Sequence, residues 1–157
     1  MPRPVKWRRV EFIPRNRHFV PSSDSEDAPG EIVLQIEEVE ALRLKDLEGL
    51  EQEACADKME VSRQTFQRVL SSAREKVADA IINGKAIRIA GGNYTRHICR
   101  IRCLECGRDW KESFEKYEEI LKGEYRCAFC GSQGVECLSG PGRGFCRKNC
   151  RRHGRNK

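Results

Sequence analysis

Two Cys-x2-Cys pairs constrain the fold of this 157-residue chain more than any other feature. The four cysteines are Cys103, Cys106, Cys127 and Cys130. Twenty residues, 107–126, separate the pairs, which is the spacing of a four-thiolate zinc site. Each pair is followed by a glycine, Gly107 or Gly131, which lets the backbone turn tightly around a metal ion. The sequence therefore predicts a structural zinc that replaces much of the core of a small, zinc-ribbon-like domain.

Four cysteines also suit other chemistry. Redox-active dithiols of the thioredoxin type usually come singly near a βαβ pattern, which this sequence lacks. An iron–sulfur cluster is the rarer competitor, because four thiolates hold it as well. Between the pairs, apolar residues fall at i, i+4, i+7 and i+11, a spacing that suits a helix as well as a ribbon hairpin. They are Trp110, Phe114, Tyr117 and Leu121.

The other cysteines form a weaker pattern. The chain has nine cysteines, and eight of them lie within residues 99–157. A candidate second metal site lies in a basic tail rich in glycine and arginine. Its members are Cys137, Cys146, Cys150 and His153. Cys99 could replace one of these ligands or stay unused, whereas Cys55 is expected to be a buried residue of a helix.

The composition favours small cores over one large core. Apolar residues make up 38% of the chain, below the roughly 45–50% of an average globular protein. No apolar run approaches the roughly 18 residues that a membrane span needs. The basic N-terminus also lacks the apolar stretch of a signal peptide. We therefore expect a cytoplasmic protein without membrane contact, in which the cysteines stay reduced.

The charges are distributed in blocks. The chain carries 30 Lys and Arg against 24 Asp and Glu, a net charge of +6. Residues 1–20, 61–96 and 131–157 have net charges of +5, +5 and +6, whereas residues 21–60 have −10. Basic blocks are what a polyanionic partner needs, although a charge run alone is equally typical of a solvated surface.

Residues 52–71, QEACADKMEVSRQTFQRVLS, have the pattern of a helix-turn-helix. Ala56 is the small residue that two helices crossing at a sharp angle need at their contact. Ser62 is a preferred N-cap for the second helix, which we expect to run to about Ile82 before a stop at Gly84. The inner faces are apolar, with Cys55, Met59, Val61, Phe66 and Val69.

The exposed side of this second helix carries side chains that can contact base edges. They are Arg63, Gln64, Gln67, Arg68 and Ser71. Arginine can pair with guanine and glutamine with adenine in the major groove, while the preceding helix crosses the backbone. A plain helical hairpin with a polar face is the alternative. At the turn, Glu60 stands where such motifs usually have a left-handed glycine, and another residue there costs about 1–2 kcal/mol.

We expect a mostly α fold with a short two-stranded β element. Residues 1–30 would form a basic arm and a flexible loop, residues 31–94 the helix-turn-helix domain, and residues 97–157 the cysteine-rich zinc-binding domain with its basic tail. Strands are expected at 32–36 and 86–90, and they could pair. The arm could lie along DNA phosphates or pack on the helices as a strand. Its candidate phosphate contacts are Arg3, Lys6, Arg8 and Arg9.

The segments MPRPVKWRRVEFIP and EEVEALRLKDLEGLEQEACADKMEVSRQTFQRVLSSAREKVADAIINGKAIRIAGGNY resemble an uncharacterised prokaryotic family of predicted DNA-binding proteins. The resemblance covers residues 1 to about 94, and its most specific part is the string EALRL…DLEGL…VSRQTF…SAR.KVADA. It implies a basic start and a helix-turn-helix similar to the fourth region of sigma factors, but no established target. The sequence departs from the family at Glu60, where glycine is usual, and at Trp7, where cysteine is frequent.

These features together predict a sequence-specific protein for double-stranded DNA, acting as a transcriptional regulator. The C-terminal half could instead sense a metal or a redox state. It could also contact RNA polymerase or another protein as a zinc-ribbon adaptor, since residues 97–130 carry equal numbers of acidic and basic side chains. No enzyme is expected, because a nucleophile–base pair, a phosphate-binding glycine loop and a three-ligand zinc pattern are all missing. The sequence leaves open whether the protein is a homodimer.

Overall fold

The computed structural model describes residues 3–22 and 30–138. The chain divides into two compact units, which we describe separately. One comprises Arg8–Tyr94 and contains the helix-turn-helix, and we call it the helical unit. The other comprises Met1–Trp7 and Thr95–Lys157, and we call it the cysteine unit. The helical unit is therefore inserted into the chain of the cysteine unit.

The expectation of a mostly α fold is wrong, because the described residues form a mixed α/β structure with three sheets. The helices are α1 (Ile36–Leu42), the π-helix η1 (Arg43–Leu47), α2 (Gln52–Met59), α3 (Arg63–Asn83) and α4 (Phe114–Leu121). The strands are β1 (Arg8–Arg9), β2 (His18–Phe19), β3 (Glu31–Leu34), β4 (Ala86–Ile89), β5 (Tyr94–Thr95), β6 (Ile98–Cys103), β7 (Asp109–Ser113) and β8 (Val135–Cys137). Strands this short show little alternation, so a sequence pattern reveals few of them.

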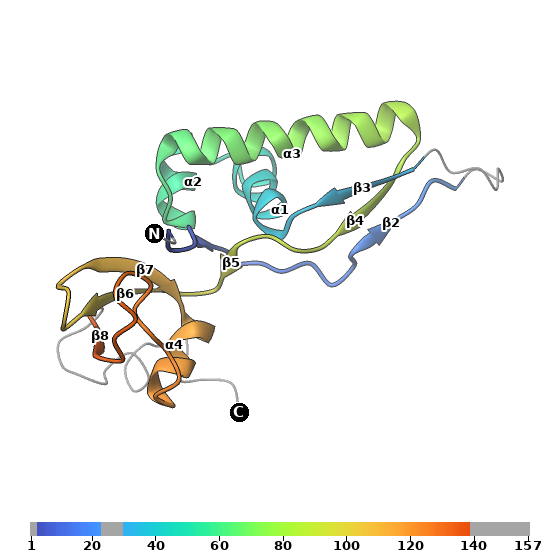
Figure 1. Cartoon of the computed structure of the whole chain (residues 1–157). Helices are drawn as coiled ribbons and strands as arrows, with labels where there is room; N and C mark the ends of the chain where they lie inside the picture. The colour runs from blue at the N-terminus through green and yellow to red at the C-terminus, as the bar shows by residue number, and fades with distance from the viewer. Residues whose placement is uncertain (1–2, 23–29, 139–157) are drawn as a thin grey trace. The chain divides into compact units, whose positions relative to one another are not determined.

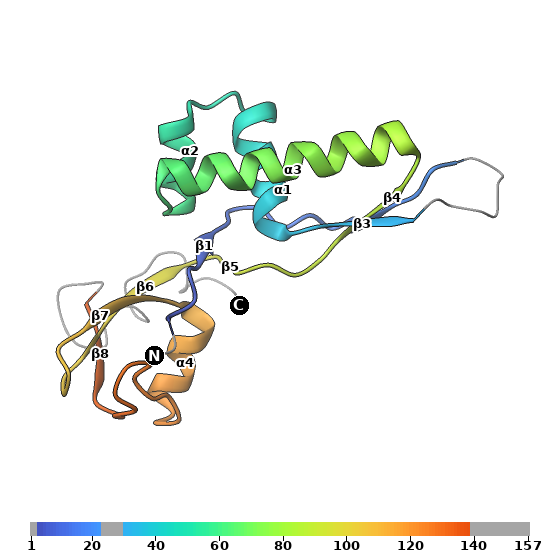
Figure 2. The same cartoon turned by 45° about the horizontal axis from the view of Figure 1, so that its top comes forward.

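The sheet of the helical unit has the order β2-β4-β3. The expected pairing of segments 32–36 and 86–90 is confirmed, since β3 and β4 run parallel with Ile32 opposite Ile87. The third strand, β2, comes from the predicted arm and pairs antiparallel, with Phe19 opposite Ile87. α3 lies along this sheet in both views (Figure 1, Figure 2). A buried cluster joins the arm, the sheet, α1 and α3, and it contains Val10, Leu34, Ile36, Ala73 and Ile89.

The helix-turn-helix consists of α2 and α3, and α2 lies across the N-terminal end of α3 (Figure 1). Ser62 is the N-cap of α3, as expected, and its hydroxyl accepts a hydrogen bond from the Thr65 amide at 3.1 Å. α3 ends at Gly84, which has a left-handed conformation. No helix in the described part of the chain is both long and apolar enough to cross a membrane. The core around the two helices contains Ala41, Leu44, Cys55, Ala56, Met59, Phe66 and Leu70.

Glu60 ends α2 in the left-handed conformation expected at this turn, with φ 54° and ψ 41°. A side chain costs about 1–2 kcal/mol in this conformation, and glycine avoids that cost. We expect Glu60→Gly to be more stable than Glu60→Ala by about 1 kcal/mol, because both variants lose the carboxylate and only glycine relieves the strain. Urea unfolding followed by circular dichroism measures the difference. Equal unfolding midpoints for the two variants would contradict this account of the turn.

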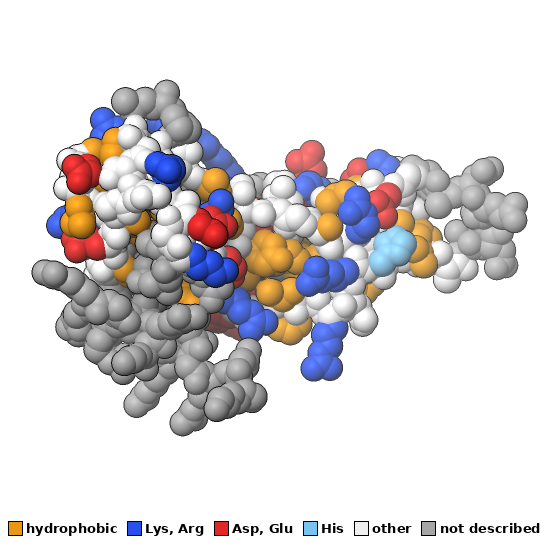
Figure 3. All heavy atoms as spheres, turned by 60° about the horizontal axis from the view of Figure 1, so that its bottom comes forward, with side chains coloured by type: hydrophobic (Ala, Val, Ile, Leu, Met, Phe, Trp, Pro, Cys, Tyr) orange, Lys and Arg blue, Asp and Glu red, His pale blue; other side chains and the backbone are white. Residues whose placement is uncertain are grey.

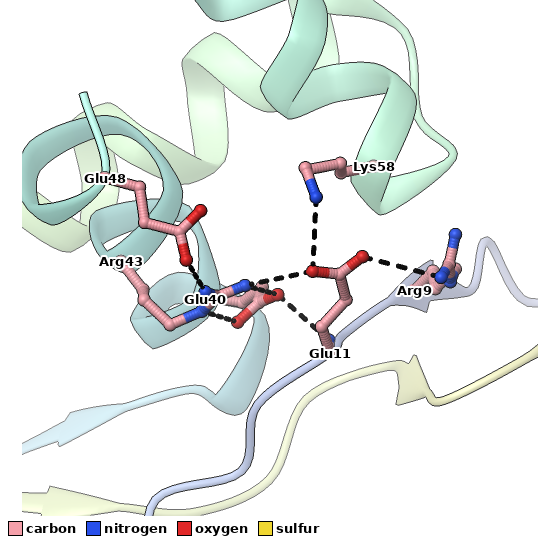
Figure 4. Close-up of polar contacts among 6 residues, drawn as sticks. All are labelled: Arg9, Glu11, Glu40, Arg43, Glu48 and Lys58. Atoms are coloured by element: carbon pink, nitrogen blue, oxygen red, sulfur yellow. Dashed lines mark hydrogen bonds and ion pairs between the residues drawn. The ribbon is translucent and has the colours of Figure 1, made fainter. Parts of the chain in front are cut away.

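An ion-pair network ties the arm to α1 and η1 within the helical unit (Figure 4). The Arg43 guanidinium donates to the two carboxylate oxygens of Glu40 at 2.8 and 2.9 Å, and it also pairs with Glu48. The Glu11 amide donates to Glu40 at 2.9 Å. Glu40 is 1% exposed, so its charge depends on these partners. The Glu11 carboxylate has three cationic neighbours, namely Arg9, Arg43 and Lys58.

The cysteine unit is built on the sheet β7-β6-β8, in which both outer strands run antiparallel to β6. Alternation along β6 defines the inner face of the sheet, because Cys99, Ile101 and Cys103 are buried and the arginines between them are exposed. The apolar residues between the cysteine pairs had a spacing that suits a helix or a hairpin, and this part of the chain contains both a strand of the β6–β7 hairpin and the helix α4. Strand β7 leads directly into α4, which begins at Phe114.

Candidate functional site

The four cysteines of the two Cys-x2-Cys pairs lie together in the cysteine unit, and their sulfur atoms are all within 4.8 Å of one another. The sulfurs of Cys103 and Cys130 are 3.6 Å apart, and those of Cys106 and Cys127 are 3.8 Å apart. A tetrahedral zinc with Zn–S bonds of about 2.3 Å requires sulfur–sulfur distances of about 3.8 Å. These two distances match that requirement, and the cluster as a whole is compatible with a four-thiolate metal site.

Both cysteine pairs make the same backbone turn. The Gly107 amide donates to the Cys103 carbonyl at 3.0 Å, and the Gly131 amide donates to the Cys127 carbonyl at 2.9 Å. The amides of Cys103 and Cys127 in turn donate to carbonyls five residues further on, at 3.0 and 2.8 Å. The two glycines have φ values of 69° and 74°, which glycine adopts without strain. The tight backbone turns expected at both glycines are thus present, and the glycine amides donate to carbonyl oxygens.

The surroundings of the sulfurs favour thiolates only in part. The Cys106 amide is the main reason why the pKa of Cys103 falls to about 7. The Ser132 amide lowers the pKa of Cys130 in the same way, but burial and the contact with Cys103 outweigh it and raise that pKa to about 12. Several negative charges this close together repel one another unless a cation offsets them. A bound metal ion would supply this charge, and thiolates select soft or borderline metals.

A buried carboxylate near the cysteines is a feature that the sequence did not reveal. Glu112 on β7 is 7% exposed and accepts hydrogen bonds from the Tyr125 hydroxyl and the Trp7 indole, both at 2.7 Å. The Trp110 indole donates to the Tyr125 oxygen at 3.1 Å. Burial, and next the bond to Glu112, raise the pKa of Tyr125 well above its usual range. Because Trp110 and Tyr125 belong to the same core as two of the four cysteines, this network supports the cluster.

The five predicted base-contacting residues lie on the exposed surface of α3 near its N-terminus. They are Arg63, Gln64, Gln67, Arg68 and Ser71. Two of them contact α2 at the surface. The Gln67 side-chain nitrogen donates to the Gln52 side-chain oxygen at 3.0 Å, and the Arg63 guanidinium lies 3.4 Å from the Glu53 carboxylate. The sequence did not single out Gln52, because its contact with Gln67 depends on how the two helices cross.

A surface hollow of about 680 Å³ follows the same part of α3. Four of the five predicted residues line it, together with Gln52 of α2 and residues from the middle of α3. On the face shown in Figure 3, basic side chains are instead scattered among hydrophobic and acidic ones. The structure thus gathers amide and guanidinium groups along a concave surface of the helix-turn-helix.

The four basic residues of the predicted arm have different surroundings. Arg3 and Lys6 are exposed, whereas Arg8 and Arg9 are half-buried in β1. Arg9 belongs to the ion-pair network of Figure 4. The next residue, Val10, is buried in the core of the helical unit. Residues 8–10 therefore pack on the helical unit, which is one of the two arrangements that the sequence allowed for the arm.

Of the candidate second metal site, only Cys137 lies in the described part of the chain, where it ends β8. Cys146, Cys150 and His153 lie outside the described residues. Cys99, the alternative ligand, is buried in β6. Cys55 is buried in α2, as expected for a structural residue of a helix.

Residues 1–97 match the family model described as "Protein of unknown function DUF134". The chain belongs to this family. Membership confirms the resemblance to an uncharacterised prokaryotic family. Over 151 residues, this DUF134 chain is 54% identical to a UPF0251 protein of Caldicellulosiruptor bescii, which covers 96% of the chain and 99% of that protein. It is 46% identical over 157 residues to a UPF0251 protein of Clostridium botulinum, covering all of the chain and 95% of that protein. No solved structure matches this DUF134 chain.

Proposed function

We propose that this protein binds double-stranded DNA through α3 and acts as a sequence-specific regulator of transcription. The observation that carries the proposal is the exposed set of amide and guanidinium groups near the start of a helix that a second helix crosses. These groups pair bidentately with adenine and guanine in the major groove. In this arrangement α3 would enter the groove while α2 crosses the sugar–phosphate backbone.

The charge around α3 supports this orientation. Residues 61–96 have a net charge of +5, and the first turn of α3 has no acidic residue. The side chains of Arg63 and Glu53 are 61% and 77% exposed, so their ion pair is weak. Such a pair contributes about 0–1 kcal/mol, whereas a good bidentate base contact contributes about 1–3 kcal/mol. DNA can therefore displace Glu53 from Arg63 at a net gain.

The contact between α2 and α3 also prepares one amide for binding. Gln52 accepts a hydrogen bond from the side-chain nitrogen of Gln67, which leaves the Gln67 oxygen and one N–H for a base. Since the amide is oriented before DNA arrives, less side-chain freedom is lost on binding. This makes Gln67 the best candidate among the five for reading an adenine.

We also propose that the four-cysteine cluster holds a structural zinc. Four sulfur ligands leave no open coordination position, which a catalytic zinc requires. The ion would stabilise a unit whose core is small and includes two of the four cysteines, Cys103 and Cys127. This donor set favours a binding protein over an enzyme.

Selection of bound fragments from random duplexes, repeated at several salt concentrations, tests the DNA proposal. Arg68→Ala should weaken binding to the selected site by about 1–3 kcal/mol and weaken binding to random duplex far less, because a base contact is lost. A palindromic site would in addition indicate a dimer.

Arg88→Ala is a matched control for this variant. It removes the same charge from β4, where Arg88 makes an exposed ion pair with Glu31 at 2.8 Å. We expect Arg88→Ala to cause only a small loss of binding affinity, equal for the selected site and for random duplex. If Arg68→Ala also weakens binding to both duplexes equally, its side chain contacts phosphate and does not contact a base. If wild-type protein selects no sequence, the proposal of specific binding fails.

A further inference from the structure

An exposed apolar patch lies in the helical unit, where the C-terminal end of α3 comes close to β2. Phe19 and Val20, at the end of β2, are 53% and 66% exposed, and Ile81 of α3 is 74% exposed. These three residues, which we call the apolar patch, line a hollow of about 260 Å³ together with Ala80 and Ile87. Single exposed apolar side chains are common on proteins, but a contiguous group of them is typical of an interaction surface.

Beside the apolar patch, β2 presents a free strand edge. β2 is an outer strand of its sheet, on the side away from β3 (Figure 1), and no strand in the described part of the chain pairs with its outer edge. The Ile89 amide donates to the Arg17 carbonyl at 2.7 Å, so the backbone groups of Arg17, and of Phe19 two positions later, face β4. Those of His18 and Val20 therefore face outward, where another strand can pair with them.

The surroundings of the apolar patch suit a second copy of this chain. The adjoining residues 23–29, outside the described part, read SDSEDAP and offer no large apolar side chain to cover the patch. At the rim of the hollow, Lys85 pairs with Asp79 at 2.9 Å, and their side chains are 29% and 37% exposed. Because this rim carries one charge of each sign, two copies can face each other with opposite charges matched.

We propose that the helical unit forms a twofold dimer, in which β2 pairs with β2 of a second copy and the two apolar patches pack together. A twofold axis perpendicular to the sheet makes this strand pairing antiparallel. With the axis at Phe19, His18 would pair with Val20 of the second copy, and the sheet would continue across both copies. The two Phe19 side chains would lie opposite each other, close to Ile81 of each copy. The inference goes beyond DNA binding and does not depend on it.

Sedimentation equilibrium of the reduced, zinc-loaded full-length protein tests this contact, at concentrations from roughly 1 µM to 1 mM. We expect the wild type to dimerise reversibly. Ile81→Glu should raise the dissociation constant of the dimer by roughly 100-fold, because the twofold contact would bury two added carboxylates. Ile82→Glu is the matched control, since Ile82 is 80% exposed but does not line the hollow. It should keep the dissociation constant of the wild type, and circular dichroism checks that both variants remain folded.

Val20→Pro tests the strand pairing by itself. Proline removes the outward N–H of Val20 but no hydrogen bond to β4, so the unit should keep its fold while pairing between copies is weakened. We expect the dissociation constant to rise at least about tenfold, whereas Val20→Ile, which keeps the amide, should dimerise like the wild type. Equal dissociation constants for these two variants would overturn the strand pairing. A monomeric wild type would assign the apolar patch to another kind of partner and overturn the dimer, as would equal effects of Ile81→Glu and Ile82→Glu.

Discussion

Cys103→Ser is expected to unfold the cysteine unit and to leave the helical unit folded. Cys103 supplies one of the four sulfurs and lies at the end of β6, the central strand of that sheet. The apparent binding free energy of a structural zinc is about 10–16 kcal/mol at neutral pH. Losing one ligand removes a large part of this stabilisation, and a core this small cannot replace it. The helical unit has two hydrophobic clusters of its own and contains none of the four cysteines.

Amide hydrogen exchange resolved by residue, together with zinc content, measures this effect in each unit. Cys55→Ser is the matched control, because it makes the same substitution at a buried position of the helical unit. It should keep its zinc and lose little stability, since the new hydroxyl can retain the contact with the Leu50 carbonyl. If Cys103→Ser loses exchange protection throughout α3 as well, the two units unfold together and the assignment of separate units is wrong.

Arg43→Met is expected to lower the free energy of unfolding of the helical unit by about 3–5 kcal/mol. Glu40 is 1% exposed, so its carboxylate would lose two charged hydrogen bonds while remaining buried. The hydrogen bonds to Glu40, followed by its charge and those of Glu48 and Glu11, hold the pKa of Arg43 above its usual range. Methionine preserves much of the aliphatic length, so the loss reports on charge more than on packing. Urea unfolding, followed by the circular dichroism signal of the helices, measures this change in the free energy of unfolding.

Arg74→Met is the control for this variant. Arg74 makes two hydrogen bonds to Asp46, at 3.1 and 2.5 Å, but both side chains are about half exposed. Exposed ion pairs contribute about 0–1 kcal/mol, so the loss should stay within that range. Adding Glu40→Leu to Arg43→Met should recover much of the lost stability, because an apolar pair needs no partner charge. Equal losses for Arg43→Met and Arg74→Met would show that burial does not determine the strength of the network.

The helix-turn-helix could be predicted from sequence because its determinants are local. Ser62 caps the helix that follows it directly, and Glu60 stands at the turn between two adjacent helices. The four-cysteine cluster could be predicted for a similar reason. Each Cys-x2-Cys-Gly turn is closed by hydrogen bonds within five residues, so its spacing is visible in the chain.

Strands β3 and β4 could be predicted from sequence, but the other strands and the buried carboxylates could not, because they depend on contacts between distant residues. Strand β2 has two residues and pairs with β4 about 70 positions away, so it leaves no alternation to detect. Trp7 and Glu112 are 105 positions apart, so their hydrogen bond could not be predicted from either local sequence.

The insertion of the helical unit between Trp7 and Thr95 has a consequence for the nascent chain. Trp7 leaves the ribosome first, but its partner Glu112 is translated 105 residues later. At about 5–20 residues per second, that delay is roughly 5–20 seconds, ample time for a small domain to fold. The helix-turn-helix therefore has time to fold during translation, before the segment that carries the four cysteines is complete. If the four-cysteine cluster holds zinc as proposed, binding of zinc would be the last step of folding, and chains made without zinc would have a folded helical unit and an unfolded cysteine unit.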